Sequence, residues 1–170
     1  MTGMLFSCSN DVSEIHAYRD KQEENLLTTY YNSDLVYSDS AKLQIRIKAG
    51  IMKKFDGEDE RTEFDNDVHV WFYDDAGNPQ TQLKANRATR MDKTGAMEAF
   101  GNVILTNYKG ETLNTEHLIY DEEKERIHTN EMVKITGEKE TIWGEGMIAN
   151  TTFTKYTVKK YKSQTELKNE

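Results

Sequence analysis

Residues Leu83–Ile135 read LKANRATRMDKTGAMEAFGNVILTNYKGETLNTEHLIYDEEKERIHTNEMVKI, and this stretch decides the fold. It contains the same pattern twice. Leu83 and Leu113 are 30 residues apart (113 − 83), and Val103 and Val133 are separated by the same interval. A short repeated unit cannot bury its apolar face alone, so neighbouring units must stack on one another.

Each copy of the repeat is a two-strand unit. It opens with an apolar, a polar and a small residue, turns over at residues 92–95 or 121–124, and closes on a strand. The opening phrase also occurs upstream, at Ile47-Lys48-Ala49, and a fourth copy begins at Trp143. We expect Trp143 to pack in the core, because it stands where Leu83 and Leu113 stand in their copies. The sequence therefore predicts a stack of tandem two-strand units.

The composition indicates a single globular domain. The chain has 170 residues, of which 36% are hydrophobic, and this suffices for one sizeable core. The formal net charge is -8, and an acidic surface disfavours nucleic acid, whose phosphates attract Lys and Arg. No run approaches the roughly 20 apolar residues that a membrane-spanning helix needs. We therefore expect a globular domain without a nucleic-acid partner.

The strand pattern predicts an all-β, antiparallel fold. Residues 42–48 alternate cleanly between apolar and polar, and residues 67–73 form the strongest strand. We expect about a dozen or more short strands and no helix in the domain. Tandem units favour an open jellyroll or sandwich with free edges over a closed barrel. The expected domain covers residues 27–161, after a remnant signal (1–8) and a polar tether (9–26) and before a disordered tail (162–170).

No catalytic constellation stands out. The sequence has no nucleophile elbow, no phosphate-binding glycine-rich loop and no pair of histidines at helical ligand spacing. The histidines are scattered, so we expect no metal site, no cofactor and no enzyme activity. Trp71 and Trp143 could stack on a sugar. A carbohydrate-binding surface lipoprotein without a transport role therefore stays open as an alternative.

The single cysteine, Cys8, excludes an intramolecular disulfide. Leu5-Phe6-Ser7-Cys8 resembles a bacterial lipobox, with Leu three residues before the cysteine and a small residue directly before it. Phe6 departs from the usual small or β-branched residue there, and only seven residues precede Cys8, too few for a complete signal region. We expect lipidation at Cys8, followed by the polar tether.

The order of these features resembles one known family. Tyr37-Ser38-Asp39-Ser40 precedes the first alternating strand, residues 99–103 read AFGNV, and residues 142–147 read IWGEGM. Together with the lipobox and the tandem units, these phrases make residues 33–160 similar to LptC and to the related OstA-like domains. LptC is the periplasmic subunit of the lipopolysaccharide export bridge, and the similarity is to its lipoprotein form from Bacteroidetes-type bacteria.

The resemblance implies a fold, a location and a role. The fold would be a twisted, slightly open β-jellyroll, held in the periplasm at the inner membrane through Cys8. Family members receive lipopolysaccharide from the inner-membrane ABC transporter and pass it towards the outer membrane through a groove between their sheets, without catalysis. One end would pair edge to edge with the transporter's periplasmic domain, and the other with an LptA-like bridge protein.

An apolar inner face would line the groove. We expect it to consist of Leu43, Ile45, Ile47, Val68, Val70, Phe72, Leu83, Ala85, Val103, Leu105, Leu113, Val133 and Ile135. The small residues Ala49, Ala85 and Thr115 recur at matching points, where they would either leave room for acyl chains or simply pack on each other.

Polar contacts and a partner edge complete the expected site. Lys84, Arg87 and Arg90 are candidates for contact with the phosphates of the lipid. Tyr156, Thr157 and Val158, near the end of the domain, are the expected partner edge.

Overall fold

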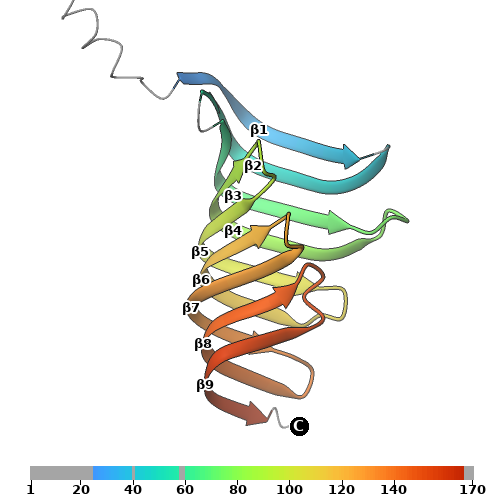
Figure 1. Cartoon of the computed structure of the whole chain (residues 1–170), viewed down its shortest axis with the longest axis vertical. Helices are drawn as coiled ribbons and strands as arrows, with labels where there is room; N and C mark the ends of the chain where they lie inside the picture. Colours follow the sequence, from blue (N-terminus) through green and yellow to red (C-terminus); the bar gives the residue numbers. More distant parts are fainter. Residues whose placement is uncertain (1–24, 40, 58–59, 167–170) are drawn as a thin grey trace, which may run out of the picture.

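The computed structural model describes residues 25–39, 41–57 and 60–166 as one antiparallel β-sheet in which the strands follow chain order (Figure 1). The prediction of an open, all-β, antiparallel fold is confirmed: β1 and β9 are the two edges of the sheet and do not pair with each other. The strands are β1 (Asn25–Asp39), β2 (Lys42–Asp56), β3 (Arg61–Tyr73), β4 (Pro79–Met91), β5 (Met97–Asn107), β6 (Thr112–Asp121), β7 (Arg126–Thr136), β8 (Glu140–Asn150) and β9 (Tyr156–Glu166).

The described residues form nine long strands, fewer than the dozen or more short ones predicted. The cause is a break in the alternation near the middle of most strands. In β4 the buried residues run Leu83 and Ala85 and then Ala88, so the inward face moves by one residue within a single strand. In a sequence, such a break in the alternation predicts the end of one strand and the start of another.

Bulges produce these breaks. In β3, Asn66 and Asp67 stand opposite one residue of β4, and in β5, Gly101 and Asn102 stand opposite one residue of β6. All four have positive φ, between 49° and 74°. This left-handed region suits Gly, Asn and Asp, which explains the phrase AFGNV at residues 99–103. Because a bulge bends its strand, and the bulges lie at matching places, the whole sheet bends along one line (Figure 1).

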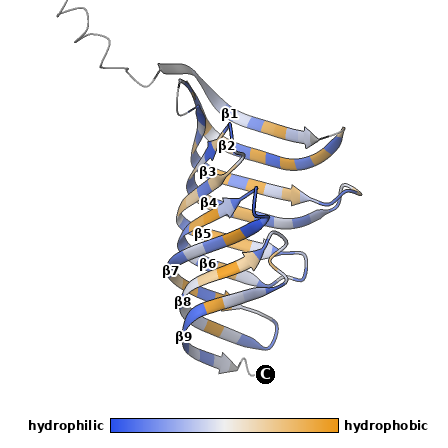
Figure 2. Ribbon diagram, viewed as in Figure 1, coloured by the Kyte–Doolittle hydropathy of each residue, from blue (hydrophilic) through white to orange (hydrophobic). Residues whose placement is uncertain are grey.

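The bend folds the sheet into two facing layers. Layer A contains the strand halves next to the β1–β2, β3–β4, β5–β6 and β7–β8 turns, and layer B contains the halves next to the other four turns. Apolar and polar residues alternate along the strands in both layers (Figure 2). The two layers share one core of buried residues.

Cross-strand rows build this core. In layer A one row of paired residues crosses eight strands: Leu35, Ile47, Val70, Leu83, Leu105, Leu113, Ile135 and Ile142. In layer B a shorter row contains Met52, Phe64, Ala88, Ala99 and Leu118. Such paired apolar side chains fix the register of a sheet.

The predicted core position of Trp143 is wrong. Ile142, which pairs with Ile135, continues the apolar row of layer A, and Trp143 points outward with 39% of its surface exposed. Neighbouring residues in a strand face opposite sides, so the alignment of the fourth repeat is off by one residue.

The strands also extend past the expected domain limits of 27 and 161. β1 begins at Asn25, and β9 continues to Glu166 because Glu166 pairs with Glu140. Residues 162–166 are therefore strand, where a disordered tail was expected. The expected lipobox with Cys8 lies outside the described residues, as does the tether up to residue 24.

An ion pair fastens edge strand β1 to β2, and it makes the edge sensitive to acid. Arg46 donates two hydrogen bonds, of 2.8 and 2.7 Å, to the carboxylate of Asp34. These bonds lower the pKa of Asp34 from 3.8 to about 2. A depressed carboxyl pKa stabilises the folded state above 3.8, and this stabilisation is lost as the pH falls towards 2.

We therefore expect amide exchange in β1 to accelerate between pH 4 and pH 2, as measured by hydrogen–deuterium exchange with correction for the intrinsic pH dependence. The Asp34→Asn variant, which keeps the shape of the side chain, should exchange faster at neutral pH and lack the acid step. An identical acid step in both proteins would show that another group controls the edge.

Candidate functional site

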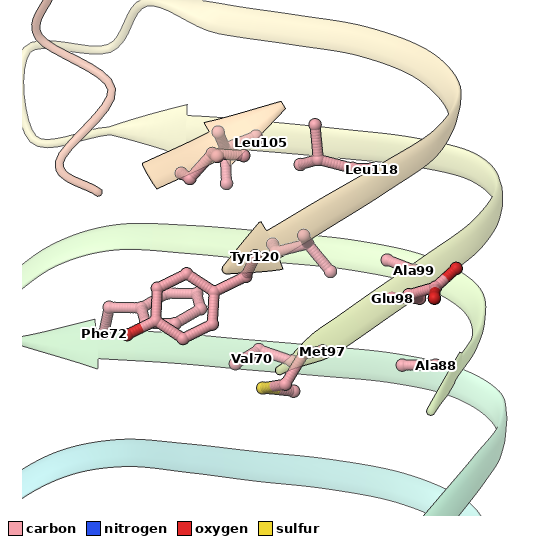
Figure 3. Close-up of a pocket in the computed structure, with 11 residues that line it drawn as sticks. Val70, Phe72, Ala88, Met97, Glu98, Ala99, Leu105, Leu118 and Tyr120 are labelled. Carbon is pink, nitrogen blue, oxygen red and sulfur yellow. The ribbon is translucent and has the colours of Figure 1, made fainter. Parts of the chain in front are cut away.

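The interior between the layers is apolar and almost filled. One pocket between the layers is lined from layer A by Val70, Phe72, Leu83 and Leu105 and from layer B by Ala88, Met97, Glu98, Ala99, Leu118, Tyr120 and Ile127 (Figure 3). The free volume between these side chains is about 20 Å³, room for about one water molecule. The interior is thus a continuous apolar space that is closed by its own side chains.

Small residues stand where the layers converge. Ala49, Ala85 and Thr115 are the last inward residues of their layer A halves, directly before the bend, and each is at most 7% exposed. Space between facing layers is smallest next to the bend, so these positions admit little more than a methyl or hydroxyl group. Their recurrence reflects this geometry, and the free space lies instead next to Phe72 and Tyr120.

Side chains opposite the bend close the open side of the sheet, and we call these contacts the seam. In the N-terminal half, Arg90 of layer B lies over the ring of Tyr37 of layer A, with 4.5 Å from the guanidinium carbon to the ring centroid. Next to it, the rings of Phe72 and Tyr120 meet at 5.5 Å (Figure 3). Burial raises the pKa values of Tyr37 and Tyr120, so the hydroxyls of these two residues stay neutral.

In the C-terminal half the seam is made of hydrogen bonds and one buried ring. Asn107 donates a 2.8 Å hydrogen bond to the carbonyl of Phe153, and the Thr81 hydroxyl lies 3.5 Å from the carbonyl of Thr151. Phe153 is fully buried and stacks on Tyr156 at 5.3 Å. The β8–β9 loop therefore plugs this half of the open side.

A cavity with an acidic lining, which we call the mouth, lies outside the seam. Its volume is about 500 Å³, and its lining includes Asp74 and Asp75 of the β3–β4 turn and Glu122 and Glu125 of the β6–β7 turn. Asp74 accepts a hydrogen bond of 2.8 Å from the backbone of Asn78 and further bonds from Ala76 and Gln80. The bond from Asn78 is the main reason that the pKa of Asp74 lies below its usual value. The mouth therefore carries negative charge at neutral pH.

Arg90, next to the C-terminal end of β4, is a basic side chain that reaches the interior. It lies in an inward row between Thr62 and Met97. Its guanidinium is 3.3 Å from Asp92 and 3.9 Å from Glu122, so two carboxylates balance its charge. Its buried Nε has no hydrogen-bond partner among the described residues.

The sequence matches the family described as "Lipopolysaccharide-assembly, LptC-related" over residues 3–164 of this chain. The chain belongs to the LptC-related family. This membership confirms the resemblance seen in the sequence, and the family's description assigns its members to lipopolysaccharide assembly. A search of functionally curated proteins finds no match for the chain.

A solved structure shares the fold of this LptC-related domain. It is LptH from Pseudomonas aeruginosa, the LptA-homologous periplasmic component of the conserved lipopolysaccharide transport device. The TM-score is 0.55 at 19% sequence identity, over 72% of this chain and 85% of LptH. At this level of identity the similarity establishes the fold only.

Most residues expected on the inner face of the LptC-related domain do point inward. Leu43 and Phe72 are half-buried, and the other eleven members of the expected set are buried. All of them lie in layer A. The sequence reasoning missed layer B, including Met97, Ala99 and Ile127, although Met97 and Ile127 are separated by the same 30 residues (127 − 97) as the recognised repeat.

The expected phosphate contacts are not brought together. Lys84 pairs across the sheet with Ile104 on the outer face of layer A, and Arg87 is exposed, with its guanidinium 6.0 Å from the ring of Phe100. Only Arg90 turns towards the interior. Tyr156 and Val158, from the expected partner edge, are half-buried on edge strand β9, and Thr157 is exposed.

The three histidines of the described residues, His69, His117 and His128, lie on strands at separate outer positions. The rings of His69 and Trp71 are tilted by 30° with their centroids 3.7 Å apart, and His117 stacks on Phe100 at 4.5 Å. Burial lowers the pKa values of His69 and His128. Within the described residues no group of three or more His, Cys, Asp or Glu side chains could hold a metal ion. That part of the chain also contains no helix long and apolar enough to cross a membrane.

Proposed function

We propose that this LptC-related domain binds the acyl chains of lipopolysaccharide between its layers and passes the lipid from the inner-membrane ABC transporter towards the outer membrane, without catalysing a reaction. The observation that carries the proposal is the apolar row of layer A. It crosses eight strands without interruption and reaches edge strand β1 at Leu35. A continuous apolar interior that reaches an edge suits a chain-like apolar ligand handed from one protein to the next.

Apolar burial must supply most of the affinity in this proposal. Each buried methylene contributes roughly 0.8 kcal/mol, so one acyl chain contributes several kcal/mol. Charge works in the opposite direction, because the mouth presents Asp74, Asp75, Glu122 and Glu125, which repel lipid phosphates. Arg90, 3.9 Å from Glu122, offsets part of the charge of that carboxylate where the lipid passes from the mouth into the interior.

The two layers must separate to admit an acyl chain. Free space for about one water molecule cannot hold a chain of many methylenes, so Phe72 and Tyr120 must move apart. A small hinge at the bulges would achieve this, because the pairing of β2 to β8 is interrupted along the bend.

The free edges fit two different partners. At β1, the inward-facing Tyr30 is 50% exposed, so a strand added there would cover it and continue the apolar interior. β1 contains two aspartates and no basic residue, whereas β9 contains Lys159, Lys160 and Lys162. In our proposal the transporter's periplasmic domain adds at one edge and an LptA-like bridge protein at the other, each with charges complementary to its edge.

The proposed location is the periplasm, with the domain held at the inner membrane through a lipid on Cys8. Sixteen residues (24 − 8) separate Cys8 from the first strand. This length lets a tether carry the domain away from the membrane surface.

A site-specific cross-linker tests the proposed ligand and its location. Benzoylphenylalanine placed at Phe72, which faces the interior cavity, should give adducts with lipopolysaccharide in living cells. Trp71 is the matched control, because it is the neighbouring aromatic residue on the opposite face of the same strand. Equal adducts at both positions, or adducts only at position 71, would exclude an interior lipid site.

A further inference from the structure

A concavity on the outer wall of layer A lies apart from the interior and the seam. It measures about 350 Å³ and is open to solvent. An outward row of paired residues crosses it on four strands: Ile104 of β5, Asn114 of β6, Lys134 of β7 and Trp143 of β8. Four strands span three spacings, about 14 Å, which matches the length of a short oligosaccharide.

A gap in the strand pairing creates the concavity. Pairing between β6 and β7 stops at Asn114 and Lys134 and resumes at Ile119 and His128. Four residues of β6 (115–118) thus face five residues of β7 (129–133), and the Thr115 hydroxyl bridges the gap with a 2.9 Å hydrogen bond to the carbonyl of Met132. The gap lies in the middle of the sheet, where no edge is available for an added peptide strand.

One flank of the concavity is apolar. Trp143, Met132 and Ile104 are 39%, 51% and 39% exposed, respectively, although they come from three different strands. Exposed large apolar side chains that gather in a hollow mark a binding site more often than scattered ones do. The Lys134 ammonium lies over the Trp143 ring, and the apolar C–H face of a sugar ring can pack against the part of the indole that stays exposed.

The other flank is polar and partly fixed in place. The backbone N–H of Asn102 donates a 3.3 Å hydrogen bond to the carboxylate of Glu116, which holds Glu116 at the rim. The side-chain amides of Asn102 and Asn114 make no hydrogen bond within the described part of the chain. An amide both donates and accepts hydrogen bonds, as a sugar hydroxyl does.

The charge of the concavity indicates a neutral ligand. Its lining includes one acidic residue, Glu116, and one basic residue, Lys134, whose Nζ lies 5.0 Å from the centre of the Trp143 ring. These charges offset each other, so the site attracts neither an anionic nor a cationic partner in particular.

We propose that this concavity is a binding site for a short neutral oligosaccharide, stacked on Trp143 and hydrogen-bonded by Asn114, Asn102 and Glu116. The site is independent of the proposed lipid transport, because it opens on the outer wall of layer A. Two sources share this chemistry: the neutral sugars within the saccharide portion of lipopolysaccharide, and an unrelated neutral glycan.

Fluorescence of one tryptophan tests the site. The chain contains two tryptophans, so in a Trp71→Phe protein all tryptophan emission comes from Trp143. We expect saturable changes in this emission, with dissociation constants in the millimolar range, on titration with saccharide released from lipopolysaccharide by mild acid or with maltohexaose. Binding of the released saccharide alone would identify lipopolysaccharide as the source of the ligand. Binding of both saccharides would identify a general glycan site.

Matched variants exclude a non-specific effect. In the same background, Asn114→Ala should weaken binding about ten-fold, whereas Gln82→Ala removes an amide from the same outer wall beyond the concavity and should change nothing. No emission change with either saccharide, or equal losses in the two alanine variants, would overturn the proposal. Cross-linking of lipid at Phe72 would be unaffected by that outcome, so the two proposals fail separately.

Discussion

A disulfide across the seam should stop the domain from taking up lipid. With Cys8 changed to Ser, Thr81→Cys and Thr151→Cys place two thiols on opposite layers, where the Thr81 hydroxyl lies 3.5 Å from the carbonyl of Thr151. The bond fixes the layers at their present separation, which leaves room for about one water molecule. Lipopolysaccharide adducts at position 72 should therefore fall to background in the oxidised protein and return on reduction.

The control is a second pair of thiols that leaves the seam free. Thr106 and Thr112 are cross-strand partners on β5 and β6, both within layer A. A disulfide at Thr106→Cys and Thr112→Cys joins strands that are already paired, so it should not alter lipid uptake in either redox state. Undiminished uptake by the oxidised Thr81–Thr151 protein would show that lipid reaches position 72 without parting the layers.

Replacement of Phe153 by Ala should cause the largest loss of stability among single substitutions in the loops. The ring is fully buried and stacks on Tyr156, and the backbone carbonyl of Phe153 accepts the hydrogen bond of Asn107. Phe-to-Ala changes in cores cost about 3–5 kcal/mol, a large share of the roughly 5–15 kcal/mol that keeps a typical domain folded. Urea unfolding followed by circular dichroism measures the change.

A second aromatic residue at the same end of the sheet provides the comparison. Tyr161 of β9 is 57% exposed, so Tyr161→Ala should change the free energy of unfolding by no more than about 0.5 kcal/mol. If Phe153→Ala cost as little as Tyr161→Ala, the β8–β9 loop would not be the plug that closes the C-terminal half of the seam.

The sequence was sufficient to predict layer A and insufficient to predict layer B, and the bulges explain the difference. Leu83 and Leu113 mark layer A through the repeat, and their alternation with polar neighbours is unbroken up to Ala85 and Thr115. Past the bend, the inward face moves by one residue, so Ala88 and Leu118 fall out of phase with what precedes them. Alternation alone cannot follow a strand through such a change of phase.

Like the fold, the functional site was predictable from the sequence only in layer A. Inward positions in layer A were found because burial there follows alternation. The seam was not found, because it joins residues far apart in the sequence, such as Tyr37 with Arg90 and Asn107 with Phe153. The outer concavity was also missed, since an error of one residue placed Trp143 in the core. Such contacts depend on how the sheet folds over, which a local pattern does not encode.

The number of strands restricts how the domain can be extended. Strands in an antiparallel sheet reverse direction at each step, so among the nine strands of the described residues β1 and β9 run the same way, both from layer B to layer A. A second copy added end to end, with its layers aligned, would meet β9 through a parallel junction, the slightly weaker kind of pairing. A different protein whose edge strand runs from layer A to layer B would join in antiparallel fashion. The odd strand count thus favours growth by a dissimilar neighbour over self-polymerisation.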